Sequence, residues 1–185
     1  MKLTVHKREG ASKGSLRFIR RDGNIPAILY SEGKQGTPIA VDGKQLRAAI
    51  REMEKGHLPT TVFELDGDAA KAKALIKEVQ YHPTSYDIIH VDLMELKQDR
   101  EIYANVPVDC IGVVDCVGIK LGGFLREVTR HIRVRCLPKA LPSHFTANVS
   151  RLGVKQSLRA RDIAFPQGVK PLIDENQVVV TIAKK

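Results

Sequence analysis

Short apolar runs, each bounded by glycine, proline or other turn-forming residues, constrain the fold of this chain more than any other feature of its sequence. Apolar runs such as 26–30 and 178–182 have the length of strands and are too short for long helices. None reaches the ~20 apolar residues of a membrane span, and the charged segment 1–10 is unlike a signal peptide. The sequence therefore predicts a cytosolic protein, away from membranes, that is mainly β with short helices.

Residues 1–95 mix predicted strands with short helices. One helix is expected over 16–21, with Ser15 as its cap and an end near Asp22, because Gly23 readily ends a helix. The other predicted elements are an amphipathic helix over 44–53, a turn at 66–67, and strands at 26–30, 38–42, 60–65, 74–81 and 88–93. Such a mixture predicts an N-terminal α+β domain built on a barrel-like sheet.

The pattern changes at residues 94–100, where we place a domain boundary. Few helix signals follow, and Val- and Ile-rich runs alternate with glycine and proline as in an all-β domain. The predicted strands of this part are 101–111, 125–137, 145–149 and 178–182, and the glycines of 118–123 predict a tight hairpin. The chain is thus expected to have two domains, residues 1–95 and residues 96–185, of which the second is all-β.

The formal net charge of +9 predicts a polyanionic partner, because clustered Lys and Arg displace counterions from phosphate backbones. This charge is unevenly distributed. Residues 1–21 hold seven basic side chains against one acidic, whereas residues 22–95 hold eight basic against twelve acidic. The first domain is therefore expected to present one phosphate-binding face, around the helix from which Arg17, Arg20 and Arg21 project.

Residues with reactive side chains form no recognisable catalytic motif. His90 and Asp92, two apart in a predicted strand, share a face and could orient a general base, but no nucleophile motif stands beside them. Phosphate-binding loops, dinucleotide fingerprints and zinc-protease helices are absent from the sequence. The sequence thus predicts a protein that is not an enzyme and has no cofactor, catalytic residue or small-molecule substrate.

The three cysteines, Cys110, Cys116 and Cys136, are an odd number at spacings unlike those of redox pairs or paired zinc ligands. Free and largely buried thiols are the expectation, because a cytosolic cysteine mostly behaves as a small hydrophobic residue. A zinc site that includes His131 is the second possibility, although its ligands would lack compact paired spacing. We therefore expect no metal.

A polar set beside the basic helix suits RNA binding better than catalysis. Amide, imidazole and carboxylate groups can hydrogen-bond to base edges and 2′-hydroxyls in the shallow minor groove of RNA. The set consists of Gln80, His82, His90 and Asp92. In the second domain, Arg133 and Arg135 share one face of a predicted strand, which is either a second RNA contact or the solvent side of a sheet.

Four segments, in this order and at this spacing, resemble one protein family. They are Arg17-x-x-Arg20, IPAILY at 25–30, VQYHP at 79–83 and HVD at 90–92. Together they resemble ribosomal protein number twenty-five of the bacterial large subunit. The segment GIKLGG at 118–123 and the β-rich second domain resemble the longer form of this family, the general stress protein CTC family. The resemblance covers essentially the whole chain.

The resemblance implies an N-terminal barrel domain that binds the irregular internal loop of 5S ribosomal RNA, within a large subunit whose other proteins are further partners. By position, basic residues would hold phosphates, and polar residues of the barrel would face the groove. The candidate RNA-binding residues are Arg8, Lys13, Arg17, Arg20, Arg21, Tyr30, Ser31, Gln80, His82, His90 and Asp92. Two positions depart from the family pattern: Ser31 stands where Gly is usual, and Tyr81 stands where a basic residue is expected.

Two other functions remain open from the sequence. One is a different cytosolic RNA-binding factor, such as a tRNA-associated protein with a barrel domain. The other is a stress protein that acts through protein contacts. Copurification with large ribosomal subunits after a high-salt wash separates the ribosomal function from both.

Overall fold

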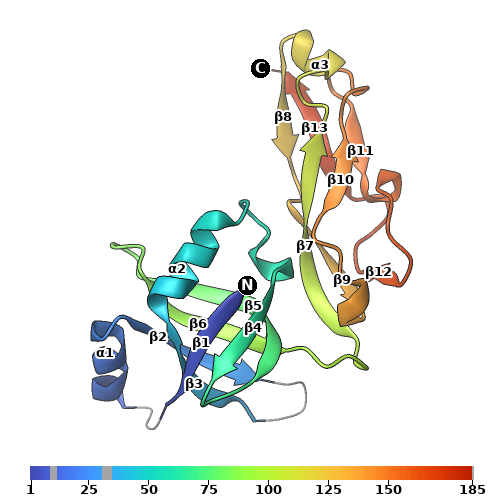
Figure 1. The fold of residues 1–185 in the computed structure, drawn as a ribbon. Coiled ribbons are helices and arrows are strands. Elements are labelled where there is room, and N and C mark those ends of the chain that lie inside the picture. The colour runs from blue at the N-terminus through green and yellow to red at the C-terminus, as the bar shows by residue number, and fades with distance from the viewer. Residues whose placement is uncertain (9–11, 31–34, 185) are drawn as a thin grey trace. The chain divides into compact units, whose positions relative to one another are not determined.

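The computed structural model describes residues 1–8, 12–30 and 35–184. The chain divides into two compact units, Met1–Lys97, here called unit 1, and Gln98–Lys185, here called unit 2 (Figure 1). Both are built mainly from strands, with short helices, so the predicted fold class is confirmed. Within the described part of the chain, no helix is long and apolar enough to span a membrane.

The strands of unit 1 form a closed barrel with the order β1-β3-β2-β6-β5-β4. Their bounds are β1 Lys2–Lys7, β2 Asn24–Tyr30, β3 Thr37–Asp42, β4 Val62–Gly67, β5 Ala72–Tyr81 and β6 Ile88–Glu95. Most neighbours are antiparallel, but β2 pairs with β6 in parallel, and β1 pairs with β4 in parallel. The β1–β4 pairing closes the barrel, so the predicted barrel-like sheet is confirmed.

Alternate side chains of these strands fill the barrel. Leu3, Val5, Phe63 and Leu93 are almost fully buried in one apolar cluster, as period-two alternation requires. Helix α2, Gly43–Glu52, adds its buried Leu46 to this cluster. The first turn of α2 is capped by the Asp42 carboxylate, which accepts from the backbone N–H groups of two α2 residues.

Helix α1, Lys13–Arg21, ends at Asp22 as predicted, but it begins earlier than the apolar pattern indicated. Its cap is Ser12, whose Oγ accepts from the backbone N–H of Ser15 at 3.2 Å, so the prediction of Ser15 as the cap was wrong. None of its residues is fully buried. Helices owe most of their stability to tertiary packing, so α1 gains little stability from the burial of apolar side chains.

Unit 2 consists of two small sheets with the orders β10-β7-β9-β12 and β11-β13-β8. Their bounds are β7 Ile102–Ile111, β8 Gly123–Glu127, β9 His131–Cys136, β10 Phe145–Asn148, β11 Ser157–Arg159, β12 Val169–Pro171 and β13 Val178–Lys184. The helical elements outside the two long helices are α3 Val117–Lys120 and 3₁₀ turns at Leu58–Thr60, Pro138–Ala140 and Ala160–Asp162. Side chains such as Val106, Ile132 and Ile182 are buried within unit 2.

Three local predictions were wrong. The run 125–137 is two strands, because the chain leaves β8 after Glu127 and starts β9 at His131 in the other sheet. The glycine-rich segment 118–123 is not a hairpin, since most of it belongs to α3 and the turn after it. Residues 66–67 form no turn, because they pair with β1 as the end of β4.

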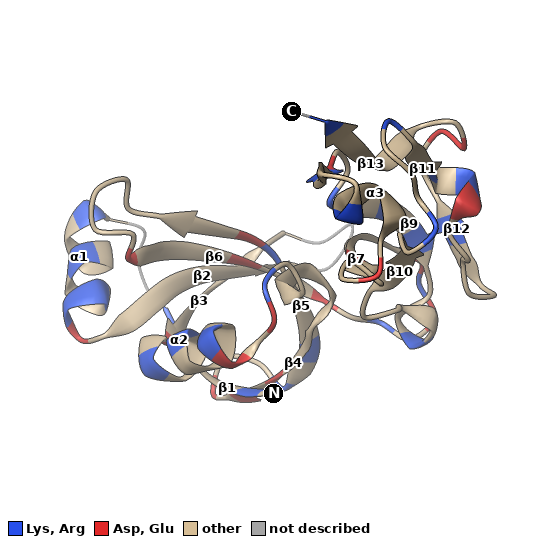
Figure 2. Ribbon diagram, turned by 90° about the horizontal axis from the view of Figure 1, so that it is seen from above, with Lys and Arg blue, Asp and Glu red and all other residues tan. Residues whose placement is uncertain are grey.

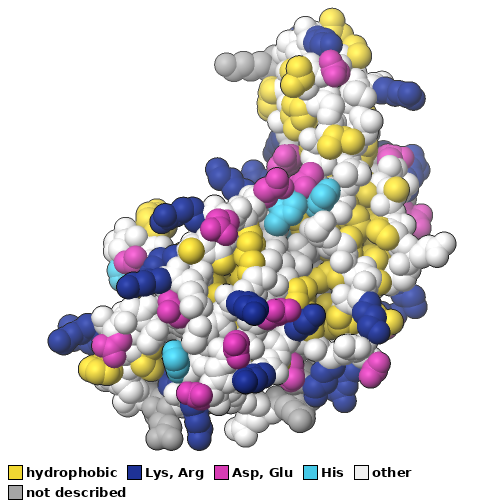
Figure 3. Space-filling model, viewed as in Figure 1, with side chains coloured by type: hydrophobic (Ala, Val, Ile, Leu, Met, Phe, Trp, Pro, Cys, Tyr) yellow, Lys and Arg dark blue, Asp and Glu magenta, His cyan; other side chains and the backbone are white. Residues whose placement is uncertain are grey.

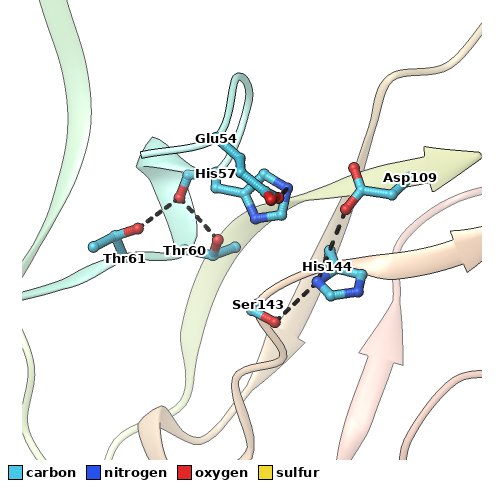
Figure 4. A network of polar contacts seen from close by, with 7 residues as sticks. All are labelled: Glu54, His57, Thr60, Thr61, Asp109, Ser143 and His144. Atoms are coloured by element: carbon cyan, nitrogen blue, oxygen red, sulfur yellow. Dashed lines mark hydrogen bonds and ion pairs between the residues drawn. The ribbon is translucent and has the colours of Figure 1, made fainter. Parts of the chain in front are cut away.

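Short polar contacts fix the loops of each unit, and Figure 4 shows them from close by. In unit 1, the hydroxyls of Thr60 and Thr61 donate to the carbonyl oxygen of His57 at 3.0 and 2.9 Å, which stabilises the 3₁₀ turn. In unit 2, Nδ1 of His144 lies 3.1 Å from the Ser143 hydroxyl and 3.8 Å from the Asp109 carboxylate.

All three cysteines lie in unit 2 and are free thiols. Cys116 and Cys136 are buried, and the Cys116 thiol donates to the carbonyl oxygen of Leu152 at 3.4 Å. Cys110 is partly buried, and this burial, with smaller contributions from Glu127 and Asp109, raises the pKa of its thiol to about 11. The structure therefore agrees with the sequence prediction of free and largely buried thiols.

Barrel closure provides a test of this fold. A Cβ on Gly67 would overlap the carbonyl oxygen of Val5, its partner in the closing β1–β4 pair. Gly67→Ala should therefore lower the free energy of unfolding by about 1–3 kcal/mol, the usual cost of overpacking. Gly14→Ala in α1 is the matched control, because its Cβ would meet no atom closer than 4.0 Å. Urea unfolding followed by circular dichroism measures both; equal stabilities would contradict this closure.

Candidate nucleic-acid interface

Neighbouring strands β2, β6 and β5 carry polar side chains on the outer face of the barrel. Their inward residues, such as Leu29 and Val91, are buried in the core, so the intervening side chains point outward. The register places Gln80 opposite His90, and Glu78 opposite Asp92. These outward residues are here called the polar wall: Tyr30, Glu78, Gln80, His90 and Asp92. The structure thus brings four of the sequence-predicted residues together.

His90 and Asp92 form the closest charged or polar pair of the wall. Nδ1 of His90 lies 2.9 Å from Oδ1 of Asp92, and their side chains are 19 % and 32 % exposed. A carboxylate can only accept, so Nδ1 donates the hydrogen to Asp92. The proton of a neutral His90 ring is therefore held on Nδ1, and Nε2 is left as an acceptor toward a ligand.

Tyr30 keeps its hydroxyl protonated at this site. Burial raises the pKa of the Tyr30 phenol above its ordinary value, and the nearby carboxylates of Asp92 and Glu78 raise it further. The phenol can therefore both donate and accept a hydrogen bond. Glu78 was missed by sequence reasoning, because a register shift between Ile76 and Glu78 interrupts the simple alternation of β5.

The turn between β5 and β6 fixes the imidazole of His82. Nδ1 of His82 lies 3.0 Å from the hydroxyl of Thr84, and it also accepts from the backbone N–H groups of Thr84 and Ser85 at 3.4 and 3.3 Å. A neutral ring that accepts at Nδ1 carries its proton on Nε2. Nε2 of His82 is therefore a hydrogen-bond donor, whereas Nε2 of His90 is an acceptor.

Tyr86 in the same turn was also missed by the sequence analysis. Its side chain is 77 % exposed, and its φ of 57° lies in the left-handed region that residues other than glycine seldom adopt. Such backbone strain concentrates at functional sites. The sequence pattern did not indicate Tyr86, because an aromatic residue in a turn looks the same in the sequence whether it is exposed or buried.

Arg20 attaches α1 to the barrel. Its Nε and Nη2 atoms both donate to the carbonyl oxygen of Ile89 on β6, at 3.1 and 3.0 Å. This pair of hydrogen bonds to one oxygen, here called the Arg20 fork, uses two of the five N–H donors of the guanidinium. The other donors stay available to a ligand. Arg20 is therefore first a positioning residue for α1, and α1 lies beside the strand that carries His90 and Asp92.

The other cations of α1 are turned to solvent. Figure 2 shows Lys and Arg recurring along this helix. Lys13, Arg17 and Arg21 are exposed, and they form no ion pair or side-chain hydrogen bond within the described residues. The structure thus agrees with the prediction that Arg17 and Arg21 project outward from this helix.

A hollow of about 370 Å³ lies beside the wall, and it is lined by residues from several elements. Arg20, Arg47 and His82 supply donors to it, and Asp87 supplies a carboxylate. Arg47, on α2, was missed because the sequence pattern described α2 only as an amphipathic helix. Two guanidinium groups beside a donor imidazole make this hollow suitable for a phosphate.

Two predicted residues are not part of this arrangement. Arg8 follows β1, which β3 and β2 separate from β6, and it lines a different hollow of about 530 Å³ beneath α1 together with Lys7 and Phe18. Ser31 lies outside the described residues. The site therefore combines a polar wall, a positioned basic helix and a donor-lined hollow.

Comparisons with known proteins agree with this architecture. The profile of the Ribosomal L25p family matches residues 3–93, and the profile described as Ribosomal protein TL5, C-terminal domain, matches residues 101–185. Similar curated proteins include those of Chlamydia muridarum (strain MoPn / Nigg), 43 % identical, Chlamydia trachomatis serovar L2, 44 %, and Chlamydia pneumoniae, 40 %. Each is named Large ribosomal subunit protein bL25, and each match spans 185 residues, 100 % of both chains. The chain therefore belongs to the ribosomal L25p family, in the form that carries a TL5-type C-terminal domain.

Proposed function

We propose that this protein is a structural constituent of the large ribosomal subunit and that unit 1 binds the irregular internal loop of 5S ribosomal RNA. The observation that carries the proposal is the polar wall beside the cations of α1. Arg17 and its neighbours neutralise phosphates, while wall residues such as His90 and Asp92 meet groups that distinguish one RNA shape from another.

The charges of the wall agree with this division of roles, in which α1 contacts phosphates and the wall recognises RNA shape. Asp92 and Glu78 are repelled by phosphates, so the wall must face 2′-hydroxyls or base amino groups, which donate to carboxylates. The fixed tautomers of His90 and His82 add one acceptor and one donor at defined places. An irregular internal loop offers such groups where a regular A-form helix hides most of its base edges.

The names of the relatives support the ribosomal part of the proposal, since each is a large-subunit protein. The protein then acts by binding rather than by catalysis, its partners are 5S ribosomal RNA and neighbouring large-subunit proteins, and it works in the cytoplasm on the ribosome. Residues 1–95 are the RNA-binding domain, and residues 96–185 are the second domain.

Arg17→Ala tests the phosphate contact. It should weaken binding of 5S ribosomal RNA and reduce the slope of log affinity against log salt by about 0.7–0.9, the contribution of one phosphate contact. Arg51→Ala is the control, because Arg51 is an exposed arginine of α2 that lines neither hollow. Filter binding between 50 and 300 mM KCl, roughly the range where screening changes most, gives both slopes. Identical slopes for wild type and Arg17→Ala would remove α1 from the interface.

Arg20→Lys tests positioning by a different readout. Lysine keeps the charge but cannot place two N–H groups on the Ile89 carbonyl oxygen as a fork. RNA affinity should fall while the salt slope stays unchanged, because the number of cations is the same. A lower slope with unchanged affinity would contradict the positioning role of Arg20.

Asp92→Ala tests shape recognition by the wall. The variant should lose about 1–3 kcal/mol of discrimination between the intact internal loop and a fully Watson–Crick-paired version, the usual cost of an unpaired polar group. Asp66→Ala is the control, since Asp66 lies on β4, outside the wall, and its side chain is 69 % exposed. Titrations of both RNAs at one salt concentration measure the effect. Equal losses on the two RNAs would place specificity elsewhere.

A further inference from the structure

The four-stranded sheet of unit 2 has an outer face that the proposed function does not use. Within this sheet, Val106 on β7 and Ile132 and Val134 on β9 are fully buried. Because side chains alternate along a strand, the intervening residues point away from this core. These outward residues of β7, β9 and β12 are here called the β9 face: Tyr103, Asn105, Arg133, Arg135 and Lys170.

The register makes the β9 face one continuous surface. Tyr103 pairs with Arg135, and Asn105 pairs with Arg133, across the β7–β9 ladder. Lys170 of β12 pairs with Arg135 from the other side. Neighbouring strands lie about 4.8 Å apart, so these groups occupy a patch only three strands wide. The buried side chains beneath it hold the patch rigid.

The face carries more positive than negative charge. Glu101 lies 3.3 Å from Nε of Arg135 and compensates that one cation. Arg133 and Lys170 take part in no ion pair within the part of unit 2 that the structure describes. Residues 96–185 hold fifteen basic and eight acidic side chains. The RNA site proposed for unit 1 does not explain this positive charge of the second domain.

An aromatic ring lies within this positive surface. The Arg133 guanidinium lies over the Tyr103 ring, 5.4 Å from its centroid, and the Tyr103 side chain remains exposed. Planar guanidinium and aromatic groups are the two surfaces on which unpaired RNA bases stack. The Asn105 amide beside them carries both a donor and an acceptor for a base edge.

We propose that the β9 face is a second RNA-binding surface, and that it takes a single-stranded segment of RNA. Unpaired bases stack on the Tyr103–Arg133 pair, while Lys170 holds the backbone phosphates. An acidic protein would satisfy the charges, but it gains nothing specific from an exposed ring and a side-chain amide. A regular duplex keeps its bases stacked inside and cannot reach the ring. The proposal concerns unit 2 alone and does not depend on the polar wall.

Binding of a twelve-nucleotide oligouridylate to the full chain, measured by fluorescence anisotropy, tests this surface. Tyr103→Val should raise Kd about five- to tenfold, because each stacked base contributes on the order of tenfold or more to affinity. Tyr103→Phe should bind like wild type, since it keeps the ring. Arg133→Ala should raise Kd similarly, because it removes one member of the stacking pair. Lys170→Ala should reduce the salt slope by about 0.7, the value for one phosphate contact with a single strand.

Arg126→Ala supplies the matched control. Arg126 is an exposed arginine of unit 2 on β8, in the other sheet, and its loss should change Kd less than twofold, within the reach of general screening. Binding of the 5S internal loop through unit 1 should survive Tyr103→Val, which separates this proposal from the proposed function. Equal losses for Arg126→Ala and Arg133→Ala, or wild-type Kd for Tyr103→Val, would overturn it. Competition by polyglutamate that is insensitive to Tyr103→Val would assign the face to acidic proteins instead.

Discussion

The parallel pairing of β2 with β6 is the constraint on which the site depends. It places Tyr30 in the strand next to His90 and Asp92, although about sixty residues separate them in the sequence. Because Ala27, Leu29 and Val91 are buried in the barrel, neither strand can slip by one residue without turning its polar side chains inward. Burial of the core thus fixes the positions of the polar wall.

Strand β6 also holds the basic helix α1 in place. The Ile89 carbonyl oxygen of β6 receives the fork from Arg20, so α1 is attached by a polar contact rather than by a buried apolar face. This arrangement leaves Lys13 and Arg17 in solvent, where they can reach phosphates. In the proposed function, shape recognition by the wall and attraction of the phosphate backbone by α1 therefore fall to adjacent but different elements.

The two units differ in how they expose apolar and charged groups. Apolar side chains are exposed at the end of unit 2 that carries α3, as Figure 3 shows, and they include Val114, Leu121 and Phe124. The charged β9 face belongs to a different part of the unit, on β7, β9 and β12. In unit 1, α1 carries the exposed cations Lys13, Arg17 and Arg21, and the polar wall carries the carboxylates of Glu78 and Asp92.

Sequence patterns predicted most of the strands, but not β11 or β12, and four of the five wall residues, because alternation and turn residues act locally. His90 and Asp92 share a face in any strand, so their proximity followed from spacing alone. Contacts that depend on tertiary structure could not be predicted from such local patterns. The hydrogen bonds of Arg20 form only because β6 lies beside α1. Arg47 lines the hollow only because of where α2 packs. The Ser12 cap was missed because the apolar pattern begins four residues later, at Leu16.

The central claim is that one face of unit 1, formed by α1, β2, β6 and β5, binds RNA. Backbone amide NMR shifts of the full chain, titrated with the 5S internal loop, test it most directly. The account predicts large shifts at Tyr30, Gln80 and His90 and along α1, with β4 nearly unchanged. Shifts concentrated on β4 and β1, or spread evenly over the barrel, would contradict it.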